Sequence, residues 1–293
     1  VLWLIVSSLV NIVLDTVFIL VFHLDVFGAA LATVLSQALA GAGCLVRMLR
    51  GYPILRTTRE DWRWDRRRMG ELCLMGLPMG LQYSITAIGS VMLQTAVNGL
   101  GTTYVTAVTA ANKVSMFICC PFDAMGCTMA TYGGQNVGAA KWDRLHQGLR
   151  SCVILGAGYA ALSLGVLYFF SGPLNMLFLD EASAQLLPLA RMYQLTQAFF
   201  YFPLALVNIF RFLIQGMGFS PLATMAGIME MIARTALAFL VPVYGFTVAR
   251  FASPAAWILA DLFLIPAYFC CFRKLTCPAA FNRTCTALYP HKK

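Results

Sequence analysis

Residues 11–37 read NIVLDTVFILVFHLDVFGAALATVLSQ, and this stretch predicts a helical hairpin within a membrane. Residues 1–22 form one apolar run, a short polar turn follows from His23 to Gly28, and residues 27–48 form a second apolar run. Each run has the length of about 20 residues that a helix needs to cross the hydrocarbon core of a bilayer. The stretch therefore favours two adjacent transmembrane helices.

Three oxygen-bearing side chains lie inside this apolar hairpin: Asn11, Asp15 and Thr33. Asn11 and Asp15 are four residues apart and share one helix face. Counted from the turn, Asp15 and Thr33 lie at similar depths, since a helix rises about 1.5 Å per residue. An acid in hydrocarbon costs about 2.5 to 3.5 kcal/mol on insertion scales and usually faces a water-filled cavity or an ion path. We predict a site for a proton or a cation; the alternative is a polar cluster that only joins the two helices.

The composition of the whole chain points the same way. Hydrophobic residues make up 60% of the 293 positions and charged residues 11%, with a mean hydropathy of +0.75. A soluble domain of this length could not bury that much apolar surface in one core. The long apolar runs contain Gly and Pro, which is typical of a helical bundle, whereas a membrane barrel shows short alternating segments. We predict an all-α integral membrane protein that contacts the lipid bilayer.

Eight apolar spans are predicted, and two of them precede a basic segment at residues 49–70. Transporters are often built from two related halves with a substrate site between them. We therefore predict that residues 1–48 are the last two helices of an N-terminal lobe, residues 71–275 a complete six-helix C-terminal lobe, and residues 276–293 a tail. Four further helices would then precede Val1. The predicted spans are 1–22, 27–48, 72–98, 102–134, 147–171, 184–214, 220–243 and 252–271.

The formal charge of +9 raises the question of a nucleic-acid partner. However, the basic residues fall in the connections between spans, as the positive-inside rule requires of a membrane protein. The basic connections are residues 49–70, the segment around Lys141 and residues 276–293, and they share one side if every span crosses once. We predict a multi-pass protein of the cell membrane with both ends of this chain in the cytoplasm and no nucleic-acid partner.

The sequence contains no pattern typical of a metal site or an enzyme. Most of the 10 cysteines lie inside apolar runs, where they act as small hydrophobic residues, and none has metal-ligand spacing. No serine is paired with a histidine in a known motif, and no HExxH is present. We predict no cofactor apart from a coupling ion, no metal and no catalytic residue.

Further charged residues lie within the later spans. We predict that Lys113, inside the fourth span, either pairs with Asp261 or Glu230 or lines a transport cavity, because an intramembrane lysine needs a partner. Glu230 and Arg234 are spaced i, i+4 and are predicted to form a self-contained ion pair. Arg211 is predicted to extend toward the cytoplasmic interface.

Several stretches resemble the multidrug and toxic compound extrusion (MATE) family of antiporters. NIVLDTVFI (11–19) and GAALATVLSQ (28–37) resemble its fifth and sixth helices, and GLPMGLQYSITAIGSVMLQTAVNGLG (76–101) its seventh. ATYGGQNVGAAKWDR (130–144) resembles the end of the eighth helix, and RFLIQGMGFSP (211–221) the close of the tenth. The order and spacing of these motifs cover essentially the whole chain.

The resemblance implies twelve helices in two lobes that open alternately to each side, of which this chain would lack the first four. It implies exchange of protons or sodium for amphiphilic, often cationic, drug-like compounds by a monomer. In one branch of the family, Asn and Asp of the fifth helix and Thr of the sixth bind the coupling cation, and they match Asn11, Asp15 and Thr33. That branch uses a further aspartate on its first helix, which this chain does not contain. A second branch uses acids on helices seven and ten, which spans 72–98 and 184–214 lack.

Alternative functions differ in class. A lipid-linked polysaccharide flippase would share the two-lobe architecture, although few basic residues are available to bind phosphate-linked lipids. A membrane-embedded enzyme is disfavoured by the missing catalytic motifs. A chain of this length could also be an inactive fragment that does not transport by itself.

Overall fold

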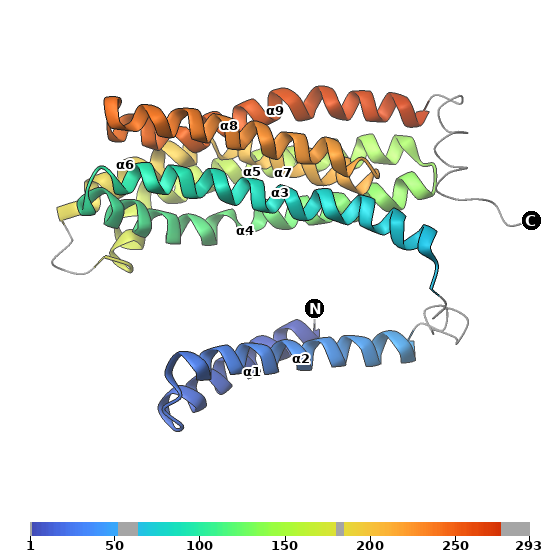
Figure 1. Cartoon of the computed structure of the whole chain (residues 1–293), viewed down its shortest axis with the longest axis horizontal. Coiled ribbons are helices and arrows are strands. Elements are labelled where there is room, and N and C mark those ends of the chain that lie inside the picture. The colour runs from blue at the N-terminus through green and yellow to red at the C-terminus, as the bar shows by residue number, and fades with distance from the viewer. Residues whose placement is uncertain (1, 52–63, 180–184, 277–293) are drawn as a thin grey trace, which may run out of the picture. The chain divides into compact units, whose positions relative to one another are not determined.

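The computed structural model describes residues 2–51, 64–179 and 185–276, and within these ranges all regular structure is helical. The chain divides into two compact units, Val1–Arg66 and Arg67–Lys293. Figure 1 shows a helical hairpin in the first unit and a helical bundle in the second. The predicted basic loop and tail fall largely on residues 52–63 and 277–293, which lie outside the described residues.

The first unit is an antiparallel pair of helices, α1 (Leu2–Leu20) and α2 (Asp25–Gly51). Ser7 of α1 donates a hydrogen bond from its hydroxyl to the Ser36 carbonyl of α2, at 2.7 Å, and both residues are buried. Gly43 of α2 lies directly against the ring of Trp3, so that no larger side chain fits there. Small residues therefore let the two helix backbones approach closely, as is usual between membrane helices.

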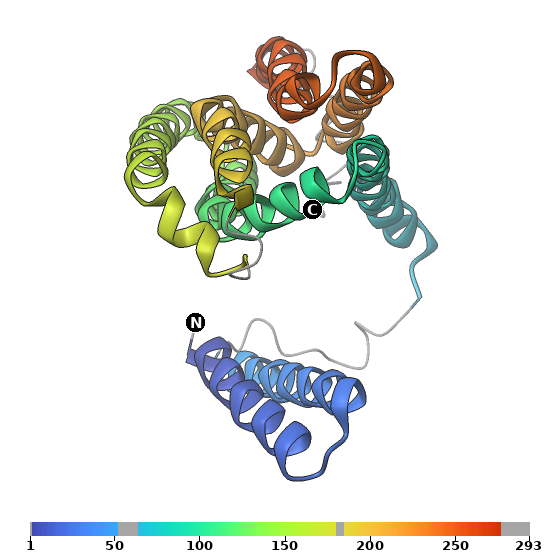
Figure 2. The same cartoon turned by 90° about the vertical axis from the view of Figure 1, so that its left-hand side faces the viewer.

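The second unit contains seven described helices whose axes run broadly along one direction (Figures 1 and 2). Their bounds are α3 (Arg66–Asn98), α4 (Thr102–Gly138), α5 (Trp142–Met176), α6 (Leu187–Phe199), α7 (Tyr201–Gly216), α8 (Ser220–Tyr244) and α9 (Phe246–Thr276). Two of them, α6 and α7, form a bent pair.

The predicted span 184–214 is broken into two helices. The axes of α6 and α7 differ by 50°, and the break falls at Phe200. Pro203 explains its position, because proline has no N–H to bond to the Phe199 carbonyl and its ring collides with that carbonyl. Pro78 and Pro121, by contrast, lie inside the continuous helices α3 and α4.

The eight predicted spans agree with the helices of the structure. Seven described helices are long and apolar enough to cross a membrane, and the bent pair α6–α7 makes an eighth if it counts as one span. The helices extend beyond several predicted ends; α2 runs to Gly51 and α3 begins at Arg66. The described part of the chain is therefore an all-α, multi-pass membrane protein.

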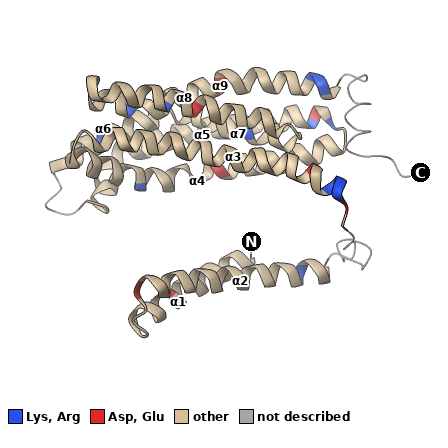
Figure 3. Ribbon diagram, in the orientation of Figure 1, with Lys and Arg blue, Asp and Glu red and all other residues tan. Residues whose placement is uncertain are grey.

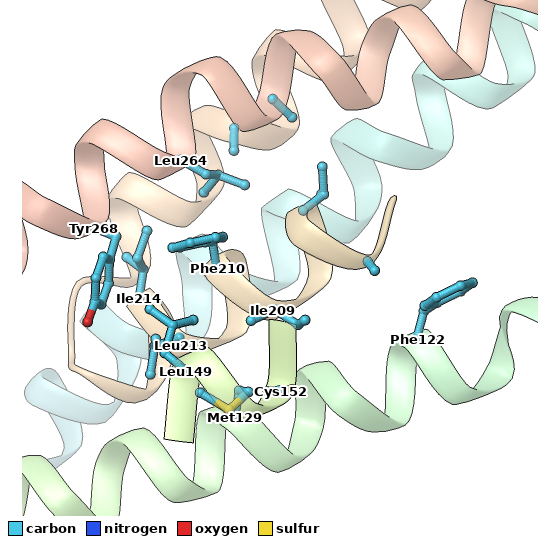
Figure 4. Packing of buried hydrophobic residues seen from close by; sticks show 14 of the residues in the cluster. Phe122, Met129, Leu149, Cys152, Ile209, Phe210, Leu213, Ile214, Leu264 and Tyr268 are labelled. Carbon is cyan, nitrogen blue, oxygen red and sulfur yellow. The ribbon is translucent and has the colours of Figure 1, made fainter. Parts of the chain in front are cut away.

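The core of the second unit is centred on α7. Figure 4 shows Phe210 and Leu213 of α7 between Leu264 of α9 on one side and Met129 of α4 on the other. Two glycines bring α4 and α7 together: Gly126 lies against the Phe212 ring, and Gly216 against the backbone of Ala130. Because α7 is covered by other helices along its length, its polar side chains must find partners inside the bundle.

Candidate functional site

The polar face of α1 points toward α2. Ser7, Asn11 and Asp15 are spaced four residues apart, and Ser7 bonds across to α2. Asn11 and Asp15 are partly buried, and the Asn11 Nδ2 and Asp15 Oδ1 atoms are shielded from solvent. Neither atom has a hydrogen-bond partner among the residues that the structure describes. The hairpin thus presents an amide and a carboxylate, one helical turn apart, with unused hydrogen-bonding capacity.

Thr33 is not joined to this pair. Its side chain is exposed in the structure, and its hydroxyl donates to the Ala29 carbonyl of its own helix at 2.9 Å. The residues of α2 that face α1 include Ala32 and Ser36, which are buried. Thr33 follows Ala32 by one position, which turns its side chain by about 100° around the helix. The predicted convergence of three side chains is therefore reduced to two within this hairpin.

A cluster of buried charges lies inside the second unit. Glu230 of α8 accepts from Arg211 of α7 and forms a further ion pair with Arg234, one turn along α8, at 3.5 Å. The three residues are between 2% and 7% exposed. The predicted Glu230–Arg234 pair is present, but it is not self-contained because Arg211 joins it. The prediction that Arg211 extends to the interface was wrong, since its guanidinium reaches Glu230 within the bundle.

Asp261 lies beside this cluster without a direct bond to it. The residue is midway along α9 and 7% exposed, and it interacts electrostatically with Glu230 and Arg211. Its Oδ1 atom is buried and has no hydrogen-bond partner among the described residues. The predicted pairing of Lys113 with Asp261 or Glu230 was wrong. The Lys113 side chain is exposed, and its ammonium lies 5.6 Å from the Phe178 ring centroid.

Polar bonds attach α3 to the same region. Gln215 of α7 donates to the Gln82 side-chain oxygen at 2.7 Å, and Thr224 of α8 donates to the Pro78 carbonyl at 2.8 Å. Arg234 also reaches the Thr86 carbonyl, at 3.5 Å. Buried amides within otherwise apolar spans were the sequence signal for these contacts, but the partners come from distant segments.

Two more polar contacts lie inside the bundle and were missed from the sequence. Asn208 of α7 donates to an Asp123 carboxylate oxygen of α4 at 3.1 Å. Asn175 of α5 donates to the Gln194 side-chain oxygen of α6 at 2.6 Å, and both residues are fully buried. Each contact joins neighbouring helices, as interhelical amides do in membranes.

Within the described ranges, no group of three His, Cys, Asp or Glu side chains could hold a metal ion. The binding of a coupling ion at Asp15 remains a prediction.

The family model described as MatE matches residues 78–240, which is more than half of the chain. The chain belongs to the MatE family. Two curated relatives of this MatE protein are probable multidrug resistance proteins of Bacillus subtilis (strain 168). YoeA is 28% identical over 188 residues, which are 61% of this chain and 40% of the relative. YpnP is 26% identical over 195 residues, which are 67% of this chain and 43% of the relative. The MatE chain thus spans about two fifths of the length of these relatives.

Solved structures of MATE transporters have the same fold as this MatE chain. An outward-facing multidrug resistance MATE family transporter of the MOP superfamily superposes with a TM-score of 0.85 at 18% identity, covering 94% of this chain and 62% of that one. The Vibrio cholerae MATE transporter VcmN in its bent form gives 0.80 at 20% identity, covering 93% and 62%. A Pyrococcus furiosus MOP superfamily transporter gives 0.80 at 19% identity, covering 94% and 62%.

These likenesses establish the helical fold of the MatE chain. The family match agrees with the resemblance read from the sequence motifs, and the protein is a member of a family of transporters rather than of enzymes.

Proposed function

We propose that this MatE protein is a cation-coupled multidrug antiporter, which exports amphiphilic and often cationic compounds by alternating access in exchange for a proton or Na⁺. The family match and the multidrug resistance proteins among its relatives support the substrate class. Small drug-like compounds and the lipid bilayer are its proposed partners. We further propose that it acts as a monomer in the cell membrane, with both ends of this chain in the cytoplasm.

One observation carries the coupling proposal. The Asp15 carboxylate lies in an apolar helix, and the structure gives its buried Oδ1 atom no hydrogen-bond partner among the described residues. Asn11, one turn away, has an unused amide N–H in the same position on the helix face. A carboxylate in hydrocarbon without a partner is costly unless it binds a proton or a cation. A polar cluster that only joined α1 to α2 would instead use these atoms in bonds between the helices, as Ser7 does.

Coupling requires that the ion bind one open state more tightly than the other. Ion binding at Asp15 then shifts the protein toward the state that it favours, and substrate binding shifts it back. Asn11 can donate to the carboxylate or offer its carbonyl oxygen to a cation. Thr33 is exposed in the described hairpin and would contribute only in another conformation.

The test is the Asp15→Asn substitution in the protein expressed from its whole coding sequence. We expect ion-driven efflux of a fluorescent cationic dye to fall by roughly tenfold or more, because the amide cannot exchange a proton or balance a cation. Asp25→Asn is the matched control. It makes the same chemical change at the exposed start of α2, where the backbone φ of 43° is one that asparagine tolerates.

Undiminished dye efflux in a membrane-inserted Asp15→Asn protein would refute the coupling assignment. If the wild-type and Asp25→Asn proteins move no dye but do move lipid-linked saccharides across liposome membranes, the flippase alternative replaces the multidrug assignment.

A further inference from the structure

The described part of the second unit buries two arginines and two acids, but only one of the two acids is paired with the arginines. Arg211, Arg234, Glu230 and Asp261 carry two positive and two negative charges when all are ionised. Both arginines direct a nitrogen at Glu230. Asp261 receives no hydrogen bond among the described residues, although it is only 7% exposed and its Oδ1 atom is buried. The two acids therefore occupy different environments within one site.

Glu230 is paired with both arginines. Its two carboxylate oxygens face two different guanidinium groups, Arg211 at Oε1 and Arg234 at Oε2. Opposite charges at such short range favour the ionised carboxylate. A proton that enters the site would have to displace one of these pairs in order to bind Glu230.

Asp261 has no such support. It lies midway along α9, roughly 22 Å from either helix end at about 1.5 Å per residue. Its nearest charged neighbours act in opposite directions, because Arg211 attracts a negative charge and Glu230 repels one. A buried carboxylate that makes no hydrogen bond is more stable when it is protonated and neutral.

We infer that Asp261 is a proton-binding site of the second unit, in a cluster where Glu230 is paired with Arg211 and Arg234. The proton joins one Asp261 carboxylate oxygen and leaves from it to water, so the charge of the cluster alternates between zero and plus one. This site is separate from Asp15, and the inference does not depend on the proposed function.

The neighbouring elements limit what else could titrate there. The groups that face the cluster are Arg211 from α7, Glu230 and Arg234 from α8, and Tyr193 from α6, which interacts with Arg234. Thr86 of α3 contributes only its carbonyl. Arginine stays protonated in proteins, and tyrosine is neutral over the physiological range. Asp261 is therefore the group in this cluster whose charge changes most readily.

The site joins three helices. Arg211 lies on α7, the helix that follows the break at Phe200, while Glu230 and Asp261 lie on α8 and α9. When Asp261 loses its proton, its negative charge attracts Arg211 and competes with Glu230 for that guanidinium. The proton thus changes the attraction between α7 and its neighbours.

The test is infrared difference spectroscopy of the protein in lipid nanodiscs, expressed from its whole coding sequence, in sodium-free buffer. A protonated carboxyl has a C=O stretch that is distinct from that of a carboxylate. We expect a band from Asp261 to remain at a pH at which the exposed acids are already ionised, and to disappear as the pH rises further. The Asp261→Asn variant should lose this one band. The Asp143→Asn variant, which changes an exposed acid in the first turn of α5, should keep it.

If the asparagine variant does not fold, the infrared spectrum of Asp261→Glu provides a second test. It keeps a carboxyl on a longer side chain, so the band should remain but move in frequency or in the pH at which it disappears. A wild-type protein without a titrating carboxyl band, or a band that is unchanged in Asp261→Asn and in Asp261→Glu, would overturn the assignment. Asp15→Asn should leave the Asp261 band in place whether or not it abolishes efflux, which separates this test from that of the proposed function.

Discussion

Glu230 is 2% exposed, and its carboxylate lies between two arginines, Arg211 and Arg234. Burying an ion pair gives little net stability, because desolvation cancels most of the attraction. Removing one partner is a different matter. It leaves the remaining charge in a low-dielectric environment without compensation, and here two guanidinium groups would be left.

We expect Glu230→Gln to lower the free energy of unfolding by about 3 to 5 kcal/mol. The measurement is the loss of monodisperse protein on heating in detergent, followed by size-exclusion chromatography. Glu71→Gln is the matched control, since Glu71 also pairs with an arginine four residues away, Arg67 at 3.3 Å, but in an exposed position. That change should cost less than about 1 kcal/mol. Equal heat sensitivity of the two variants would contradict the buried network.

The backbones of α4 and α7 lie so close together at Gly216 that only glycine fits there. A Cβ on Gly216 would collide with the Ala130 carbonyl group and lie 2.9 Å from its Cα. These are backbone atoms, so no side-chain rotation can relieve the collision.

Gly216→Ala is therefore expected to separate α4 from α7 and to destabilise the protein by about 1 to 3 kcal/mol. Gly158→Ala serves as the control, because a Cβ on Gly158 in the middle of α5 meets no atom within 4 Å. There the substitution should be neutral or stabilising by up to about 1 kcal/mol, since alanine favours helix more than glycine does. The same thermal assay distinguishes them, and a Gly216→Ala protein as stable as wild type would show that the contact can relax.

The bend between α6 and α7 also depends on how helices pack. The apolar pattern over residues 184–214 predicts one span, whereas the structure divides it into α6 and α7. Only Pro203 coincides with a helix break, at Phe200, whereas α3 and α4 continue through Pro78 and Pro121. Membrane helices tolerate proline where neighbouring groups satisfy the freed carbonyl, and this depends on packing.

At the scale of the second unit, basic residues mark one end of the bundle. In Figure 3, the ribbon is blue, the colour of Lys and Arg, where α3 begins, where α5 begins and where α9 ends. These ends share one side because successive spans alternate in direction. The positive-inside rule therefore supports the proposed cytoplasmic location of this end.

Cysteine labelling tests this orientation in a variant without native cysteines. Lys141→Cys, at the turn between α4 and α5, should react with a membrane-impermeant maleimide only after cells are permeabilised. Thr102→Cys, at the opposite end of α4, should react in intact cells. Both side chains are exposed, so access through the membrane is the remaining variable. The reverse pattern would invert the proposed topology.

The sequence alone determined the class, the spans and the family resemblance. Transfer into a bilayer depends on the composition of each segment, so the spans can be read one segment at a time. The helical spacing that joins Asn11 to Asp15, and Glu230 to Arg234, is likewise a local property.

Only the tertiary structure decided which polar groups meet across helices. A one-residue difference turned Thr33 away from α1 while Ala32 faced it. Arg211 reached Glu230, and Asp261 lay near both without a bond, because the rotation and packing of α7, α8 and α9 bring distant segments together. Such contacts depend on how complete helices pack, and the local sequence does not specify that packing.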